Sequence, residues 1–375
     1  MRSCNKNILV LLLLLSTGCT TEFFPETGNN SEQLVVEGVI TNLEMSNKIR
    51  LSRSVPVGSP VLQKPVTGAL VTVTDEKGEI TSLAEKVHGS YSTDSLTFRG
   101  RVGGKYSLKI MLEGIEYKTD FIEMKPVPQI GSLYYEKVVI AESENPADAK
   151  EGCKIYLDSY DPSGECRYFR WEYDETWEYI IPYPVVNRVC WISDRSGEVL
   201  VKNTEPYSQA RVTKFPLIYI NNKTDKLKVK YSLLVKQYSI NSSEYEFWEK
   251  IRKISQNVGG LYDKTPVAVP GNIRCVTNPS ETVNGYFSVS AVATQRLFVN
   301  EKFSGQPTFY SYCATDTIYG SLPAEGLNTL YWVIEDYANE VPSWWVTTEY
   351  RECGDCTSEG TKVRPPFWDD DVRKK

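Results

Sequence analysis

The stretch YSLKIMLEGIEYKTDFI (residues 106–122) decides the fold class. Apolar or aromatic residues occupy positions 106, 108, 110 and 112, which lie on one face of a strand because side chains alternate. Glu113 and Gly114 then separate this run from a second alternating run over 115–121. A two-residue connection ending in glycine between two alternating runs is typical of a β-hairpin. The stretch therefore predicts an antiparallel sheet with one buried face.

Further short strands are expected on the N-terminal side of this hairpin. Strand-like runs cover 34–40, 49–53 and 70–74, and the last is followed by the turn residues DEKG. No helical period separates these runs, so we expect an immunoglobulin-like or transthyretin-like β-sandwich over residues 33–128. The segment KPVP (125–128) ends it, because proline cannot continue a central strand.

Residues 129–375 are expected to form a larger β-rich domain. Runs of β-branched and aromatic residues occur at 133–140, 154–160, 168–173, 228–238, 285–293 and 329–336. One amphipathic helix is expected near 243–258, where Ser243 and Glu246 fit a capping box and Gly259 follows the last apolar position. The predicted fold class is therefore mainly β, a sandwich followed by a larger β-rich domain with one helix.

The N-terminus reads as an export signal. Arg2 and Lys6 precede an apolar run over 8–15, which is too short to span a bilayer. Small residues then lead to Cys19, in a pattern that resembles a bacterial lipoprotein signal. We expect residues 1–18 to be removed, Cys19 to carry lipid, and residues 19–32 to form a polar tether. The alternative is an ordinary secretory signal in which Cys19 has no role.

The charge and motif content favour a non-catalytic protein. The chain has 42 basic and 48 acidic residues, a balance that disfavours nucleic acid as a partner. No phosphate loop, dinucleotide fingerprint or nucleophile elbow occurs, and His88 is the single histidine. We therefore expect no enzyme activity, no metal and no cofactor. A hydrolase that uses two carboxylates remains an alternative, because the sequence cannot exclude such a pair.

Cys353-Gly-Asp-Cys356 places two cysteines near the C-terminus. The residues that follow, TSEGTKVRPP, cannot form the long helix that redox dithiols use. Outside the cytoplasm a local disulfide between Cys353 and Cys356 is the favoured prediction. A zinc site completed by Cys275 and Cys313, a redox pair and free thiols remain alternatives.

Aromatic residues are dense over 168–191. Trp177, Tyr179 and Tyr183 are candidate binding residues if the end of this segment is an exposed loop, since Trp and Tyr dominate binding surfaces. The alternative is that they belong to the core and to a hairpin that covers it.

Five segments resemble a known family: LVVEGVITN (34–42), IRLSRSVP (49–56), VPQIGSLYYE (127–136), VPGNIRCVTNPSETVNGYFSVSA (269–291) and ECGDCTSEGTKVRPPFW (352–368). The family comprises outer-membrane lipoproteins of Bacteroidota with a domain of unknown function, often encoded beside TonB-dependent receptors. The resemblance implies a lipid-anchored outer-membrane protein and brings no catalytic residues. The expected function is an accessory or ligand-binding subunit of a TonB-dependent transporter. The alternatives are a stand-alone surface adhesin or carbohydrate-binding module, and an envelope hydrolase.

Overall fold

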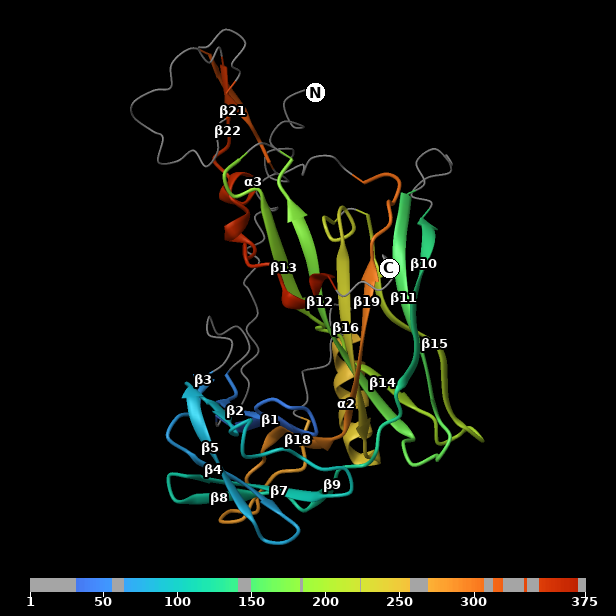
Figure 1. The fold of residues 1–375 in the computed structure, drawn as a ribbon. Coiled ribbons are helices and arrows are strands. Elements are labelled where there is room, and N and C mark those ends of the chain that lie inside the picture. Colours follow the sequence, from blue (N-terminus) through green and yellow to red (C-terminus); the bar gives the residue numbers. More distant parts are fainter. Residues whose placement is uncertain are drawn as a thin grey trace, which may run out of the picture.

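The computed structural model describes residues 32–55, 64–140, 150–182, 185–222, 224–256, 269–306, 313–319, 334–335 and 344–369. Figure 1 shows two β-rich bodies, with helix α2 (Ser242–Gln256) lying where they meet. The mainly β fold class is confirmed. Within the described ranges, no helix has both the length and the apolar character needed to cross a membrane.

The first body contains the predicted hairpin. Its two strands turn through Glu113 and Gly114, both at positive φ (51° and 83°), and Leu112 pairs with Ile115. The return strand ends sooner than expected, at Lys118, because Thr119 turns inward and its hydroxyl accepts a hydrogen bond from the Leu108 amide. The strands of this body are β1 (Leu34–Thr41), β2 (Lys48–Arg53), β3 (Lys64–Pro65), β4 (Leu70–Asp75), β5 (Ile80–Val87), β6 (Ser90–Ser92), β7 (Lys105–Leu112), β8 (Ile115–Lys118) and β9 (Ile122–Glu123).

A later segment of the chain completes this first body. Strand β17 (Arg274–Cys275) pairs with β8, and strand β18 (Asn284–Ser290) pairs in parallel with β1. Phe287 and Val289 are buried in the core of the first body. These residues fall in the region 129–375 that we expect to form the second domain, because their long-range pairing cannot be read from local pattern.

The predicted strand over 285–293 is divided between the two bodies. Ala291 is fully buried and is the single residue between β18 and β19 (Val292–Val299). Strand β19 pairs with β16 (Tyr231–Ile240) in the second body. The bodies are therefore joined by nearly continuous strand.

The second body packs two sheets against each other. A three-stranded sheet contains β10 (Ile130–Ile140), β11 (Lys150–Asp161) and β15 (Ala210–Ile220). A five-stranded sheet has the order β13 (Val189–Arg195), β12 (Tyr168–Ile180), β16, β19, with β14 (Leu200–Asn203) also paired to β12. The core between the sheets includes Phe169, Trp171 and Tyr173. Tyr168 lies on the opposite face of the strand, in a separate cluster. We call that opposite face the outer face.

Helix α2 begins one position earlier than predicted and ends at Gln256. Asn241 caps it, since its side-chain oxygen accepts a hydrogen bond from the Glu244 amide at 2.8 Å. Ser243, which the capping box would have used, instead interacts with the Tyr286 hydroxyl of β18. The helix therefore contacts the first body at its N-terminus. Val258 and Gly259 lie outside the described residues.

Short elements complete the C-terminal region. They are β20 (Asp316–Tyr319), β21 (Ile334–Glu335), β22 (Trp344–Thr347), α3 (Arg351–Gly354) and the 3₁₀ turns η3 (Cys356–Ser358) and η4 (Pro366–Asp369). Most of the strand predicted over 329–336 lies outside the described residues.

Candidate functional site

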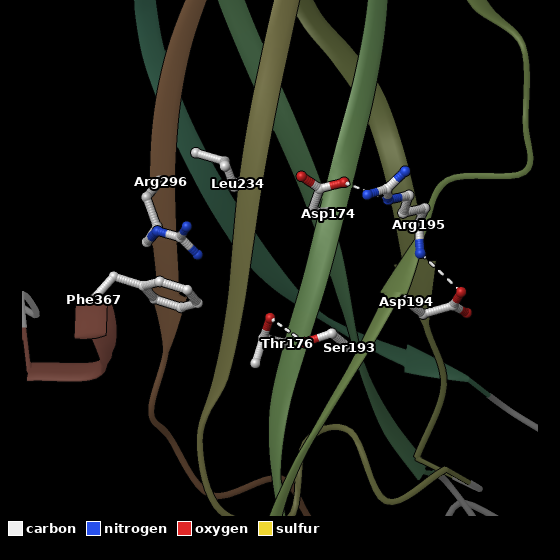
Figure 2. Close-up of a pocket in the computed structure, with 8 residues that line it drawn as sticks. All are labelled: Asp174, Thr176, Ser193, Asp194, Arg195, Leu234, Arg296 and Phe367. Atoms are coloured by element: carbon white, nitrogen blue, oxygen red, sulfur yellow. Dashed lines mark hydrogen bonds and ion pairs between the residues drawn. The ribbon is translucent and has the colours of Figure 1, made fainter. Parts of the chain in front are cut away.

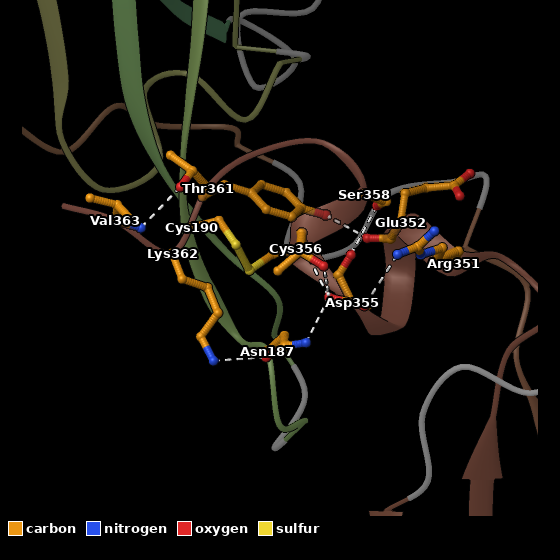
Figure 3. Close-up of a disulfide and its surroundings, with 12 residues drawn as sticks. Asn187, Cys190, Arg351, Glu352, Asp355, Cys356, Ser358, Thr361, Lys362 and Val363 are labelled. Atoms are coloured by element: carbon orange, nitrogen blue, oxygen red, sulfur yellow. Dashed lines mark hydrogen bonds and ion pairs between the residues drawn. A yellow bond between two sulfur atoms is a disulfide. The ribbon is translucent and has the colours of Figure 1, made fainter. Parts of the chain in front are cut away.

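The two cysteines of the C-x-x-C segment do not bond to each other. Cys356 is bonded to Cys190, as Figure 3 shows, and Cys353 is bonded to Cys313. The predicted local disulfide is therefore wrong. Asp355 is extended (φ −143°, ψ 102°) between helix α3 and turn η3, so each cysteine belongs to a different turn.

The zinc and redox alternatives for this segment have no support in the structure. Cys353 and Cys313 are oxidised and cannot act as metal ligands, and Cys275 lies in the core of the first body. Among the described residues, no group of three or more His, Cys, Asp or Glu side chains is arranged to hold a metal ion. Burial raises the pKa of the thiols of Cys153 and Cys166 to about 12, so both stay protonated and unreactive.

Residues 351–369, which we call the C-terminal strap, wrap around the edge of β13. Thr361 exchanges two backbone hydrogen bonds with Trp191 at that edge. Beyond it the buried ring of Trp368 packs on the outer face against Trp191 and Phe298. The Lys230 ammonium donates to the Trp368 carbonyl at 2.5 Å. The strap therefore covers one end of the outer face.

Trp177 and Tyr179 do not form an exposed platform. They are 7% and 4% exposed, because β12 continues as a strand to Ile180 and both side chains point to its inner face. The Trp177 ring nitrogen donates to Asp225, and the Tyr179 hydroxyl donates to the Glu352 carbonyl of the strap. The prediction that this pair lies on an exposed loop is therefore wrong. Tyr183, like Cys19, lies outside the described residues.

Helix α2 covers the other end of the outer face through a buried polar cluster. The Arg170 guanidinium lies over the rings of Tyr238 and Trp248, with centroid distances of 4.4 and 4.8 Å. It donates to Glu172 at 2.5 Å and lies 4.0 Å from the carboxylate of Glu244. This cluster fixes α2 against the sheet.

Glu244 also connects α2 to the first body. Its side chain is fully buried, and one oxygen accepts hydrogen bonds from Ser288 of β18 at 2.6 Å and from Trp248 at 3.2 Å. The other oxygen has no hydrogen-bond partner among the described residues. Burial raises the pKa of Glu244 above its ordinary value, and the guanidinium of Arg170 offsets only part of this effect.

Between α2 and the strap the outer face stays open. A pocket of about 340 Å³ lies there on strands β12, β13, β16 and β19, and we call it the saddle (Figure 2). Strand pairing sets its residues in two rows that cross the sheet. The first row is Arg195, Asp174, Leu234 and Arg296, and the second is Ser193, Thr176 and Ser232.

The saddle is polar and carries both acidic and basic side chains. Asp174 contacts the Lys236 ammonium at 2.6 Å and the Arg195 guanidinium at 3.7 Å. The hydroxyls of Thr176 and Ser193 are 3.0 Å apart. At the strap end, the Arg296 guanidinium donates to the Ser232 hydroxyl and lies 3.4 Å from the ring centroid of Phe367.

Sequence reasoning did not find the saddle. Its rows join residues more than 100 positions apart, from Asp174 to Arg296, which no local pattern brings together. One signal was present: the polar residues that alternate with the aromatic residues of β12, namely Glu172, Asp174 and Thr176. These polar residues indicate that one face of the strand lies outside the core.

These features define a two-body, disulfide-bonded β protein with an open polar face on its second body. A family model described as Domain of unknown function (DUF4249) matches residues 20–296, and the chain belongs to this family. A comparison with curated proteins gave no match. The matched range contains every residue that lines the saddle except Phe367, which lies beyond it with the rest of the strap.

Proposed function

We propose that this protein is a non-catalytic, lipid-anchored outer-membrane subunit that works with a TonB-dependent transporter, as an accessory or ligand-binding component. The observation that carries the proposal is the pair of disulfides that attach the strap to two distant segments. Disulfides of this kind persist in oxidising compartments such as the bacterial periplasm and the cell surface. They agree with an export signal that ends at Cys19.

The saddle supports a binding role. Its volume of about 340 Å³ lies within the range of pockets that hold small ligands. Its floor is built on four paired strands, and both of its ends are fixed, by the Arg170 cluster and by the strap. A rigid floor keeps polar side chains in place and lowers the entropy lost when a ligand binds.

The side chains of the saddle favour binding over catalysis. Asp174 is engaged by two bases, and the second carboxylate that lines the saddle, Asp194, accepts a hydrogen bond from the Arg195 amide. Glu244, the carboxylate with the raised pKa, is fully buried beneath α2. His88 is exposed on a turn of the first body. The hydrolase alternative therefore gains no specific support.

The mass of the intact protein isolated from its own membranes tests the envelope assignment. We expect a chain that begins at Cys19, carries lipid and lacks four hydrogens because of two disulfides. A Cys19→Ser variant is the control and should remain unlipidated. A mature chain that begins elsewhere and carries no lipid would contradict the anchor, and the transporter partnership would lose its basis.

A further inference from the structure

We propose that the saddle binds a short neutral oligosaccharide that lies across the strands, from the Arg195 end to the Arg296 end. The proposal rests on the ligand-binding role given above and adds the chemical class of the ligand. It follows from three properties of the saddle: its length, its hydrogen-bonding groups and its balance of charge.

The length of the saddle suits an extended ligand. Arg195 on β13 and Arg296 on β19 belong to one row and are separated by three interstrand spacings. At about 4.8 Å per spacing, the row is roughly 14 Å long. The strap limits it at one side, where Figure 2 shows the Phe367 ring beside Arg296. A ligand longer than a single sugar ring is needed to contact both ends.

The hydrogen-bonding groups match those of a sugar. Ser193 and Thr176 supply two neighbouring hydroxyls in the saddle, and each hydroxyl can both donate and accept. Ser232, the next residue in this row, is fully buried and accepts a hydrogen bond from Arg296. The adjacent row supplies an acceptor at Asp174 and a donor at Arg296. Sugar hydroxyls also donate and accept, so they can pair with both rows. A ligand that only accepts, such as a phosphate, could form no hydrogen bond with the Asp174 carboxylate, which also only accepts.

The charge of the saddle favours a neutral ligand. The lining residues carry two carboxylates, Asp174 and Asp194, and two guanidinium groups, Arg195 and Arg296, and the Lys236 ammonium beside them is paired with Asp174 at 2.6 Å. A site whose charges are close to balance exerts little net attraction on a polyanion. Leu234 interrupts the charged row and offers an apolar contact for the C–H face of a sugar ring.

Isothermal titration of the intact protein in detergent tests the proposal. The probes are maltotriose, cellotriose, laminaritriose, mannotriose and xylotriose, with trigalacturonate as the acidic counterpart. We expect at least one neutral trisaccharide to bind and trigalacturonate to bind more weakly. Thr176→Val, which keeps the side-chain shape, and Arg296→Met should each weaken binding about tenfold or more.

Arg211→Met is the matched control. Arg211 also lies over an aromatic ring, that of Tyr160 at 4.1 Å, but on β15 of the other sheet. Its substitution should leave sugar binding unchanged. Thermal unfolding of each variant shows whether the fold is kept, and Thr176→Val remains informative if Arg296→Met unfolds.

Three results would overturn the proposal. They are no binding of any neutral trisaccharide at millimolar concentration, tighter binding of trigalacturonate, and equal losses in the saddle variants and in Arg211→Met. Each of these would leave the proposed transporter partnership intact, because that partnership is judged by the receptor that purifies with the protein. If no receptor purifies with the protein, sugar binding can still be measured on the isolated protein.

Discussion

Cys356 forms a disulfide with Cys190, 166 residues earlier in the chain. Three positions before Cys356, Cys353 forms a second disulfide with Cys313. Two neighbouring cysteines therefore attach one short segment to Cys190 of β13 and to Cys313, which lies three positions before β20. The disulfides therefore help to position two aromatic residues of this segment. Phe367 lines one end of the saddle, and Trp368 is buried on the outer face.

The disulfide pairing predicts the products of a protease digest without reductant. Peptides that contain Cys190 and Cys356 should be linked, and so should peptides that contain Cys313 and Cys353. The double variant Cys190→Ala/Cys356→Ala should lose about 3–5 kcal/mol of unfolding free energy, since the bond closes a long loop. A digest that shows Cys353 bonded to Cys356 would contradict the structure.

Arg170 should be important for stability although it is far from either terminus. Arg170→Met removes a buried cation from between two rings and from Glu172, so we expect a loss of about 2–4 kcal/mol in chemical denaturation. The control is Arg195→Met, whose side chain is 86% exposed. It should cost less than about 1 kcal/mol. Equal losses for the two variants would show that the cluster does not hold α2.

Glu244 should make stability depend on pH. Because burial raises its pKa above 4.5, the folded chain keeps a proton that the unfolded chain has released. Unfolding therefore releases a proton, and the unfolding free energy falls as the pH rises from about 4.5 through the raised pKa of the folded state. The groups that face Glu244 are Arg170, Trp248 and Ser288, with Glu172 beyond Arg170.

Glu244→Gln isolates this effect. The variant has no proton to release, so its stability relative to the natural protein should increase as the pH rises through that window. Glu246→Gln is the control, since Glu246 is exposed on the same helix, and its pH profile should parallel that of the natural protein. Denaturant titrations at a series of pH values measure both variants. A Glu244→Gln profile parallel to the natural protein would contradict the prediction.

Gly285 should be important for the pairing of β18 with β1 in the first body. It has φ +86°, and a Cβ atom there would lie 2.1 Å from the Val36 carbonyl oxygen of β1. Gly114 has a similar φ of +83° with no atom within 4 Å of an added Cβ. Gly114→Ala should cost about 1–2 kcal/mol from backbone strain. Gly285→Ala should cost about 1–3 kcal/mol more because it also forces the parallel pair apart. Similar thermal stability of the two variants would show that β1 and β18 tolerate separation.

The sequence predicted the parts of the fold that depend on neighbouring residues. The hairpin at Glu113–Gly114, the strand that begins at Tyr168 and the helix before Gly259 all follow from patterns a few residues long. Pairing between β1 and β18 joins Val36 to Gly285, and no local pattern encodes that register. For the same reason the sequence analysis divided the chain at residue 128 and could not assign β18 to the first body.

The site was harder to predict than the fold. A high density of aromatic residues is typical of binding surfaces and also of protein cores. The sequence could not distinguish these two cases for Trp177 and Tyr179, and in the structure both side chains are buried. The prediction that Cys353 and Cys356 form disulfides is confirmed, but the predicted partners are wrong. Connectivity depends on where the fold places Cys190 and Cys313, which the sequence does not give. The residues of the saddle come from four strands, so the site can be recognised only when the register of those strands is known.

The central claim is that this protein works beside a TonB-dependent transporter, and co-purification tests it most directly. The tagged, full-length protein is extracted from its native membranes in mild detergent, and its partners are quantified by mass spectrometry. Cys19→Ser, which cannot be lipidated, is processed in parallel. We predict a TonB-dependent receptor in fixed stoichiometric ratio to the natural protein and its depletion with Cys19→Ser. Recovery of the lipidated protein alone, in good yield and without a receptor, would contradict the claim.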